Sequence, residues 1–240
     1  MERGFPDVGL ITQTEMVENA RYIADAVDIP LICDADNGYG NAINVWRTVR
    51  EYENAGAAAI HIEDQVFPKR CGFFAGKELI SMEEHVQKIR CALEARRDKD
   101  LVIISRCDAL AVNGWDDTIR RCYAYREAGA DVVFVDGMRT REDLENCANR
   151  LKDVPKLYNA VDVNLPMSEI AEMGFVITIQ PFPLLVSYQA IKAALTEFRQ
   201  KGVVSPEWMQ AKEYRDEVFL KVLRLSSFSQ MAERYGTTKY

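Results

Sequence analysis

The sequence predicts an α/β protein with a parallel sheet of the (β/α)₈ barrel type. Apolar segments of strand length alternate with amphipathic segments of helix length, which is typical of parallel strands joined by crossover helices. Polar residues recur at one place in this alternation, at the ends of successive strands. The length of 240 residues is close to that of one (β/α) barrel domain.

The expected helices begin at capping residues, and several end at a glycine. Thr12 and Glu15 have the spacing of a capping box and precede an apolar helical stripe that extends to Val27. Ser81 and Glu84 repeat this spacing at the start of a later helix. The other helices are expected at residues 42–55, 116–128, 140–151, 167–173, 184–200 and, in several segments, 206–235.

Six apolar segments are expected to form strands. They are residues 30–33, 57–62, 101–105, 132–135, 156–159 and 175–179. A closed barrel of this type has eight strands. We therefore expect a (β/α)₈ barrel that lacks its first two strands. Residues 1–202 would form the barrel domain, and residues 203–240 a C-terminal helical segment.

Composition and charge exclude several classes of protein. The 48% of hydrophobic residues supports a sizeable core, and the net charge of 30 − 37 = −7 argues against nucleic acid or an anionic membrane as the main partner. The sequence has no apolar run of membrane-spanning length and no signal-peptide pattern at its start. The six cysteines form no CxxC pair, so we expect free thiols in a reducing, cytoplasmic setting.

The first strand ends in two carboxylates, Asp34 and Asp36, followed by Gly38 and Gly40. Side chains two residues apart on a strand point to the same face, so both carboxylates are expected to project together. Adjacent carboxylates repel unless a cation lies between them. Oxygen ligands favour Mg²⁺, Mn²⁺ or Ca²⁺, and with few protein ligands and room for water we expect Mg²⁺. The alternative is an Asp-rich turn in which aspartate caps the next helix.

The ends of four further strands are also polar. They carry Glu63, Arg106, Asp136 and Asn159. In a parallel barrel, catalytic groups converge at the C-terminal ends of the strands, so the sequence predicts one cluster of functional side chains there. Arg106 has a structural alternative, which is a salt bridge with Asp108 or Asp136.

The two histidines are expected to differ in burial. His61 alternates with Glu63 on one strand and is interpreted as an interior histidine rather than a general base. His85 lies near the start of a helix and is expected at the surface.

A more specific motif follows the second strand, Glu63-Asp64-Gln65-Val66-Phe67-Pro68-Lys69-Arg70-Cys71-Gly72. Together with Asp34-Ala35-Asp36-Asn37-Gly38-Tyr39-Gly40-Asn41, it resembles the isocitrate lyase/phosphoenolpyruvate mutase superfamily. The resemblance extends from about Gly4 to Gly202 and is strongest to the branch of 2-methylisocitrate lyase, 2,3-dimethylmalate lyase and carboxyphosphonoenolpyruvate phosphonomutase. It implies a (β/α)₈ barrel, Mg²⁺ dependence and a homo-oligomer, dimer or tetramer, that exchanges C-terminal helices between subunits.

The resemblance also implies roles for individual residues. Lys69 and Cys71 match a Lys-Arg-Cys-Gly motif on a gating loop, where the lyases use the cysteine as a proton donor. Arg106 matches an arginine that binds and polarises the substrate carboxylate. The implied metal ligands are Asp34, Asp36 and Glu63. The implied substrate-binding residues are Asp7, Gly72, Arg106, Asp136 and Asn159.

The reaction implied by the resemblance is consistent with these residue types. A small 2-hydroxy- or 2-keto-dicarboxylate would chelate Mg²⁺, which stabilises the enolate charge formed when a carbon–carbon bond breaks. Cys71, with its thiol tuned by Lys69 and Arg70, would protonate that enolate, and Gly72 and Gly76 would allow the loop to close and exclude water.

The pattern departs from the family at several positions. The usual Cys-Gly-His reads Cys71-Gly72-Phe73, a usual glutamate is Asp136, and the segment after Asn159 that normally helps to bind the far carboxylate is shortened. Relatives also carry about two further strands before this start. Two alternatives to the lyase therefore stay open. One is a phosphonomutase that forms C–P bonds, and the other is a degenerate or truncated barrel with weak or no activity.

Overall fold

A computed structural model describes residues 3–72, 74–208 and 211–237. Phe73, one of the departures from the family motif, lies outside the described residues. The chain divides into two compact units, Met1–Pro181 and Phe182–Tyr240. The expected boundary after residue 202 differs from this division, which places the long helix that follows Pro181 in the second unit.

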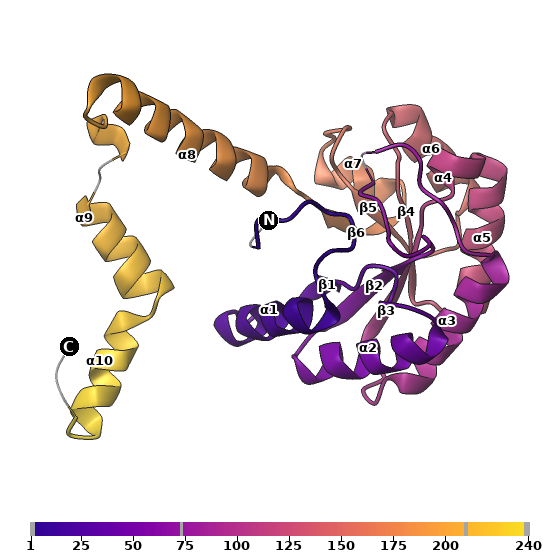
Figure 1. Cartoon of the computed structure of the whole chain (residues 1–240), viewed down its shortest axis with the longest axis horizontal. Helices are drawn as coiled ribbons and strands as arrows, with labels where there is room; N and C mark the ends of the chain where they lie inside the picture. Colours follow the sequence, from indigo (N-terminus) through magenta and orange to yellow (C-terminus); the bar gives the residue numbers. More distant parts are fainter. Residues whose placement is uncertain (1–2, 73, 209–210, 238–240) are drawn as a thin grey trace. The chain divides into compact units, whose positions relative to one another are not determined.

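The first unit contains a parallel sheet whose six strands follow the order of the sequence, β1 to β6. Figure 1 shows this sheet curving as a half-barrel. The strands are β1 (Ile32–Asp34), β2 (Ala59–Glu63), β3 (Val102–Cys107), β4 (Val132–Val135), β5 (Lys156–Asn159) and β6 (Phe175–Ile179). The α/β class, the parallel direction and the six expected strands are confirmed.

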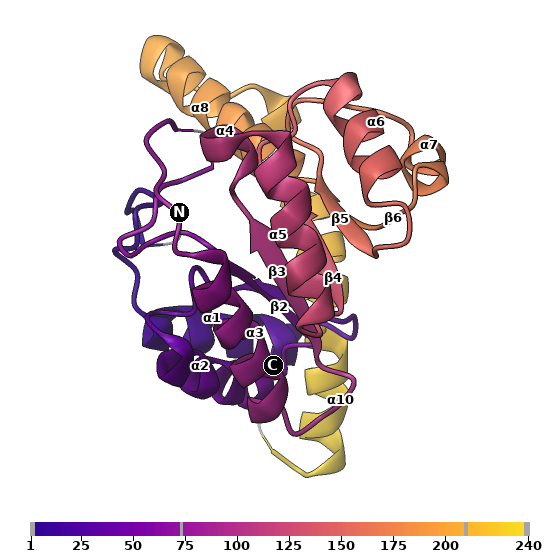
Figure 2. The ribbon, with the colours of Figure 1, turned by 90° about the vertical axis from the view of Figure 1, so that its right-hand side faces the viewer.

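Helices cover the outer face of this sheet, and α5 lies across β3 and β4 in Figure 2. The helices of the first unit are α1 (Gln13–Ala26), α2 (Ala42–Asn54), α3 (Met82–Ala95), α4 (Leu110–Asn113), α5 (Trp115–Glu127), α6 (Arg141–Arg150) and α7 (Met167–Glu172). The predicted capping box is confirmed, because Glu15 N donates to the Thr12 side chain and Thr12 N donates to the Glu15 carboxylate. At Ser81, the structure shows the hydrogen bond from Glu84 N to Ser81 Oγ.

The two faces of the sheet carry different side chains. The outer face packs apolar residues such as Ile60, Ile62 and Ile103 against the helices, whereas the inner face has a smaller apolar cluster around Ile104 and Phe134. Strands β2 and β3 end later than the pattern predicts, because Glu63 pairs with Arg106 in the ladder between the two strands, although both strands also begin later. The polar side chains at these ends therefore lie on rigid strands rather than on loops.

The prediction that His85 lies at the surface is wrong. Its side chain is completely buried between α3 and β3, where Nε2 lies 3.0 Å from Ser105 Oγ and the ring packs against Tyr125. Position near a helix start does not determine which face a residue occupies, and His85 lies on the face of α3 that packs on the sheet.

Burial of His85 predicts a pH-dependent stability. Burial, with the charges of Lys88 and Arg121, lowers the pKa of His85 from 6.5 to about 3. The unfolded chain takes up this proton below about pH 6.5 and the folded chain does not, so stability is lost as the pH falls from 6.5 towards 3. Urea unfolding should show His85→Gln losing less free energy of unfolding across this range, by up to about 1.4 kcal/mol per pH unit. Equal slopes in both proteins would contradict this assignment.

The second unit is helical. It contains α8 (Phe182–Lys201), η1 (Pro206–Trp208), α9 (Ala211–Glu213), the π-helical segment η2 (Tyr214–Val222) and α10 (Leu225–Arg234). No residue of α8, which is described throughout, is buried. Its exposed apolar side chains are Phe182, Leu184, Leu185, Val186, Tyr188, Ile191, Leu195 and Phe198. Among the described residues, no helix has the length and apolar character needed to cross a membrane.

Candidate functional site

Asp34, the last residue of β1, and Asp36, in the connection from β1 to α2, lie at the C-terminal edge of the sheet. Asp36 has a φ of 47°, in the left-handed region, and its amide donates to Asp34 Oδ1 at 2.9 Å. Gly38 is required here, because a Cβ on its backbone would lie 2.4 Å from a methyl carbon of Val45. Backbone strain of this kind is concentrated at functional sites, and the neighbouring packing holds it in place.

Buried polar side chains form hydrogen bonds to the backbone of this connection. The Tyr52 hydroxyl donates to the Asp34 carbonyl at 2.9 Å and lies 2.9 Å from the Tyr39 hydroxyl. Lys88, which is buried in α3, donates from Nζ to the Asn37 carbonyl at 2.9 Å. The two carboxylates are thus attached to a backbone that tertiary contacts hold in one conformation.

Lys69 connects this acidic edge to the N-terminal segment. Its buried Nζ lies 2.7 Å from Asp7 Oδ1 and 3.0 Å from Asp36 Oδ1. Burial lowers the pKa of Lys69, but the charges of Glu63 and the nearby aspartates raise it by more than burial lowers it. The pKa therefore lies above its usual value, and this ammonium stays protonated. Lys69 therefore neutralises part of the negative charge at the strand ends.

Glu63 is the most unusual carboxylate of the site. It is completely buried, and within the described structure neither of its oxygens has a hydrogen-bond partner. Arg106 Nη1 lies 3.4 Å from one of these oxygens. Burial raises the pKa of Glu63 well above its usual range, although the Arg106 charge opposes this. Burial and the Asp34 charge likewise raise the pKa of Asp36, although the Lys69 charge opposes this, so a cation bound at this edge would favour the ionised form of both carboxylates.

The predicted metal ligands lie at the same edge of the sheet but do not form one set of direct ligands. Among the described residues, no three His, Cys, Asp or Glu side chains converge closely enough to bind an ion together. Mg²⁺ in proteins is held by one or two carboxylates and keeps several waters. The buried oxygens of Glu63, which have no hydrogen-bond partner in the described part of the chain, and the adjacent Asp34 and Asp36 therefore fit a partly hydrated Mg²⁺.

Arg106 lies inside a cluster of carboxylates at the ends of β3 and β4. Its Nε and Nη2 donate to the two oxygens of Asp108 at 2.9 and 3.0 Å, and Nη2 also lies 3.3 Å from Asp136 Oδ2. Burial raises the pKa of Asp108, but the charges of Arg106 and Lys77 outweigh it and hold this pKa below its usual value. Both structural partners proposed for Arg106 are therefore present, and they orient the guanidinium rather than remove it from the site.

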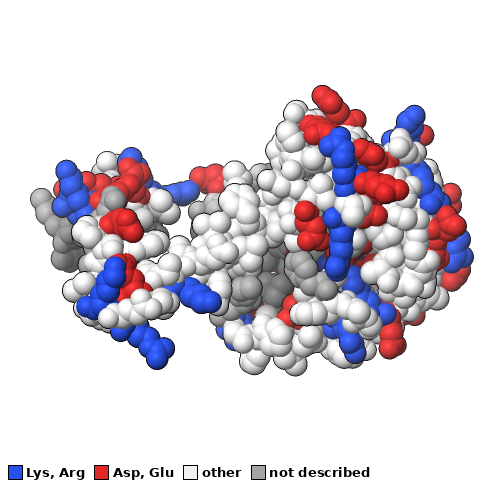
Figure 3. Space-filling view, turned by 90° about the horizontal axis from the view of Figure 1, so that it is seen from above, with Lys and Arg blue, Asp and Glu red and all other residues white. Residues whose placement is uncertain are grey.

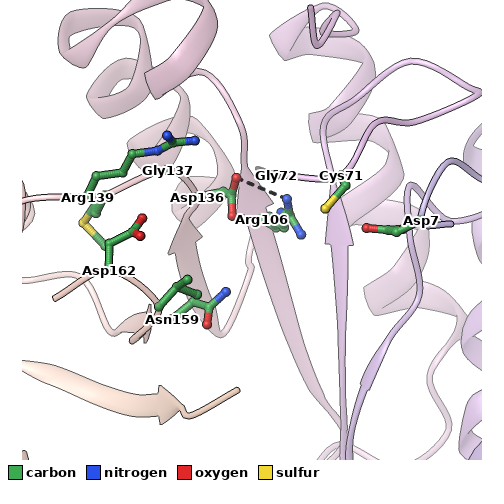
Figure 4. A pocket seen from close by; sticks show the side chains of 11 residues that line it. Asp7, Cys71, Gly72, Arg106, Asp136, Gly137, Arg139, Asn159 and Asp162 are labelled. Carbon is green, nitrogen blue, oxygen red and sulfur yellow. Dashed lines mark ion pairs between the residues drawn. The ribbon is translucent and has the colours of Figure 1, made fainter. Parts of the chain in front are cut away.

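A cavity of about 160 Å³ lies over this cluster and collects most of the predicted site residues. Its lining residues are Asp7, Cys71, Gly72, Arg106, Asp136, Gly137, Met138, Arg139, Asn159, Val161 and Asp162. Figure 4 shows Arg106 between Asp136 and Cys71, with Asp7 beyond Cys71 and Asn159 on the opposite wall. Because drug-sized ligands occupy sites of about 300–1,000 Å³, this cavity suits a small acid.

The acidic edge of the sheet lies beside this cavity. Asp34 and Asp36 line a neighbouring cavity of about 180 Å³, and Asp7 lines both. The buried oxygen of Asn159 has no hydrogen-bond partner in the described structure and is available to a ligand. The structure therefore places a guanidinium, a thiol and an amide around a space that adjoins a group of carboxylates.

The expected tuning of Cys71 by its neighbours stays a prediction. The Lys69 ammonium pairs with Asp7 and Asp36, and Arg70 Nη1 donates to the Ala75 carbonyl at 3.4 Å. Cys71 itself is half-buried at the edge of the cavity.

Sequence reasoning missed three polar residues of this region. Arg139 and Asp162 line the cavity, and Lys77 binds the carboxylates beneath it. Arg139 follows the polar end of β4 within one loop, so reading further past each strand would have found it. Lys77 lies in an irregular connection with no periodicity, and no sequence signal indicates its burial.

The exposed charges on one face of the molecule are arranged differently from the buried charges of the site. On the face shown in Figure 3, acidic and basic side chains are interspersed rather than separated by sign. The concentrated charges are those buried at the strand ends, where Lys69, Lys77 and Arg106 each contact two or more carboxylates.

Comparison with known proteins identifies relatives with the same architecture. The family model described as phosphoenolpyruvate phosphomutase matches residues 1–199. The chain is 44% identical to 2,3-dimethylmalate lyase of Eubacterium barkeri over 194 residues, which are 79% of this chain and 66% of that protein. The chain thus spans about two thirds of the length of this curated relative.

Solved structures extend the comparison. The structure of a 2,3-dimethylmalate lyase, a PEP mutase/isocitrate lyase superfamily member, has a TM-score of 0.89 at 35% identity and covers 98% of this chain and 80% of its own. Phosphonopyruvate hydrolase in complex with oxalate and Mg²⁺ has a TM-score of 0.85 at 30% identity, covering 98% of this chain and 82% of its own. Sequence, fold and family match agree, and the chain belongs to the PEP mutase/isocitrate lyase superfamily.

Proposed function

We propose that this protein is a Mg²⁺-dependent carbon–carbon lyase acting on a small 2-hydroxy- or 2-keto-dicarboxylate of the dimethylmalate or methylisocitrate type. The observation that carries the proposal is the cavity lined by Arg106, Cys71 and Asn159, next to a second cavity lined by Asp34 and Asp36. The similarity to 2,3-dimethylmalate lyase supports the same reaction class.

Each side chain has a defined task in this proposal. Arg106 offers a charge-assisted hydrogen bond to a substrate carboxylate, and Asp108 and Asp136 hold its guanidinium plane in position. Mg²⁺, when bound at the acidic edge, would stabilise negative charge that develops on the substrate oxygen. Cys71 delivers a proton to the carbon released by bond cleavage, and Gly72 keeps the loop close to the cavity.

A second candidate reaction is a phosphonomutase reaction at a C–P bond. The family description, phosphoenolpyruvate phosphomutase, and the second arginine of the cavity, Arg139, favour it. A phosphonate carries more negative charge than a carboxylate and suits two arginines. Thermal stabilisation by a hydroxydiacid or by a phosphonate, each with Mg²⁺, distinguishes the two candidates.

The same proposal includes a homo-oligomer, a dimer or tetramer in which C-terminal helices pack against other copies of the chain. The apolar side chains along α8, none of which is buried, support it. A contiguous apolar helix face of this kind is typical of a surface that another protein covers.

The proposed activity is tested by release of a 2-keto acid from a panel of hydroxydiacids, with and without Mg²⁺. We expect release that depends on Mg²⁺, and we expect Glu63→Gln to raise the Mg²⁺ concentration for half-maximal activity by roughly 10-fold or more, because one carboxylate charge is lost. Glu145→Gln, at an exposed glutamate paired with Arg141, is the control and should leave this concentration unchanged. No release from any substrate would favour the degenerate barrel, and release without Mg²⁺ would contradict the metal assignment.

A further inference from the structure

The connection between β2 and α3, residues 65–80, is described at 65–72 and 74–80; it carries Cys71 and Gly72 to the cavity and Lys69 to Asp36 at the acidic edge. Its two limbs are joined at the base, where Gln65 forms a bridge with Leu79 and Val66 N donates to the Glu78 carbonyl at 2.9 Å. We call this segment the cavity loop. Its tip can leave the cavity only if the contacts between the loop and the strand ends break.

Lys77 makes the strongest of these contacts from the returning limb. It is only 5% exposed, and its Nζ lies 2.8 Å from Asp108 Oδ1 and 2.7 Å from Asp136 Oδ2. These two carboxylates follow different strands, β3 and β4. One ammonium therefore ties the loop to two neighbouring strand ends.

The same two carboxylates hold Arg106, the arginine proposed to bind substrate. Arg106 donates to both oxygens of Asp108 and lies 3.3 Å from the Asp136 oxygen that Lys77 also contacts. Two cations and two carboxylates thus alternate in a closed ring, Lys77–Asp108–Arg106–Asp136. The positive and negative charges balance within this ring, which is buried beneath the cavity.

Two further contacts bring the cavity loop onto this ring. The Gln65 amide donates to Asp108 Oδ1 at 3.2 Å and to the Arg70 carbonyl at 3.0 Å, so the outgoing limb is bound to the same aspartate. At Gly72 the backbone is so close that a Cβ would lie 2.7 Å from Asp136 Oδ2 and 3.2 Å from Arg106 Nη2. Both limbs and the tip of the loop therefore rest on the ring.

We propose that Lys77 is a positioning residue that latches the cavity loop closed. It also shares Asp108 and Asp136 with Arg106, so that these carboxylates do not take up all the hydrogen-bond donors of the guanidinium and a substrate carboxylate can bind there. Without the Lys77 ammonium, both carboxylates would have Arg106 as their main cationic partner, and the returning limb would lose its ion pairs to the strand ends. Loop closure and the orientation of Arg106 are then coupled through one buried charge.

The reactivity of the Cys71 thiol can be used to measure whether the cavity loop is closed. It is half-buried at the loop tip, and Cys33, Cys107, Cys122 and Cys147 are buried, whereas Cys91 is half-buried on α3, away from the loop. N-ethylmaleimide labelling of the full chain, followed by mass spectrometry, measures the reaction rate at each thiol separately. Cys91 is the internal control in every sample.

We expect Lys77→Met to raise the labelling rate of Cys71 by at least 10-fold while that of Cys91 is unchanged. Lys77→Arg should restore slow labelling, because it keeps the charge, and Lys152→Met, at an exposed lysine, should have no effect. Lys77→Gln, which keeps an amide donor, replaces the methionine variant if that variant does not fold. Unchanged Cys71 labelling in a folded variant without the Lys77 charge would overturn the latch.

The role in positioning Arg106 rests on the proposed function and has its own measurement. Lys77→Met should raise KM for a hydroxydiacid and lower kcat. Lys77→Arg should restore KM more completely than kcat, because sharing the charge of Asp108 and Asp136 needs less exact geometry than closing the loop does. Faster Cys71 labelling with no keto-acid release from the unmodified chain would leave the latch standing and reject the lyase. Release with a KM unchanged by Lys77→Met would reject the positioning role.

Discussion

Replacement of Arg106 by lysine should lower kcat/KM for a hydroxydiacid by roughly 10²–10³-fold, about 3–4 kcal/mol of transition-state stabilisation. The guanidinium donates to both Asp108 oxygens and also lines the cavity, so it can contact Asp108 and a substrate carboxylate at the same time. An ammonium is a point charge that cannot reproduce this forked geometry. Steady-state kinetics with each substrate of the panel measure the loss.

The lysine variant is chosen because it keeps a positive charge among three carboxylates. Arg106→Met would leave Glu63, Asp108 and Asp136 short of a cation and should destabilise the fold by about 3–5 kcal/mol, which would confuse the result. Arg141→Lys, at an exposed arginine, controls for the substitution itself. Near-normal kcat/KM in a folded Arg106→Lys protein would show that Arg106 has only a structural role.

Replacement of Cys71 by serine should reduce turnover by roughly 10²–10⁴-fold, the usual contribution of a general acid, with little change in substrate affinity. Cys71 lines the cavity beside Arg106, and a serine hydroxyl has nearly the same size but is a much weaker acid. Keto-acid release gives kcat, and thermal stabilisation by substrate and Mg²⁺ gives affinity. Cys91→Ser, at the other half-buried thiol, is the matched control.

Isotope exchange separates proton donation from a structural role of Cys71. A proton donor also catalyses the reverse step, so the unmodified protein should exchange the new carbon-bound hydrogen of the acid product with deuterium from the solvent. Cys71→Ser should lose this exchange together with turnover. If exchange persists while turnover falls, another group is the donor and Cys71 contributes to loop packing.

The arrangement of strands and helices could be read from the chain because it depends on local patterns. Apolar runs, capping residues and terminal glycines act over a few residues, so the order of strands and helices and the parallel direction followed from the sequence. The polar ends of strands predicted the neighbourhood of Arg106, Asp136 and Asn159 for the same reason, because parallel strands bring their C-terminal ends together.

Other features depended on contacts between distant residues. His85 was assigned to the surface because helix position alone does not say which face meets the sheet. Lys69 and Lys77 lie in an irregular loop that no periodicity describes, and their ion-pair partners belong to distant segments of the chain. Their environment is set by strands that lie far away in the sequence.

The sequence by itself determined the superfamily, the parallel α/β order and the residue types that meet at the strand ends, because motif and periodicity are properties of short segments. Only the tertiary structure decided how these charges pair. It left the Glu63 oxygens buried without hydrogen-bond partners among the described residues, placed Lys69 between Asp7 and Asp36, and joined Arg106 with Lys77, Asp108 and Asp136 in a ring of four charges. Coulomb interactions depend on distance and burial in space, and neither quantity is written in the spacing of residues along a chain.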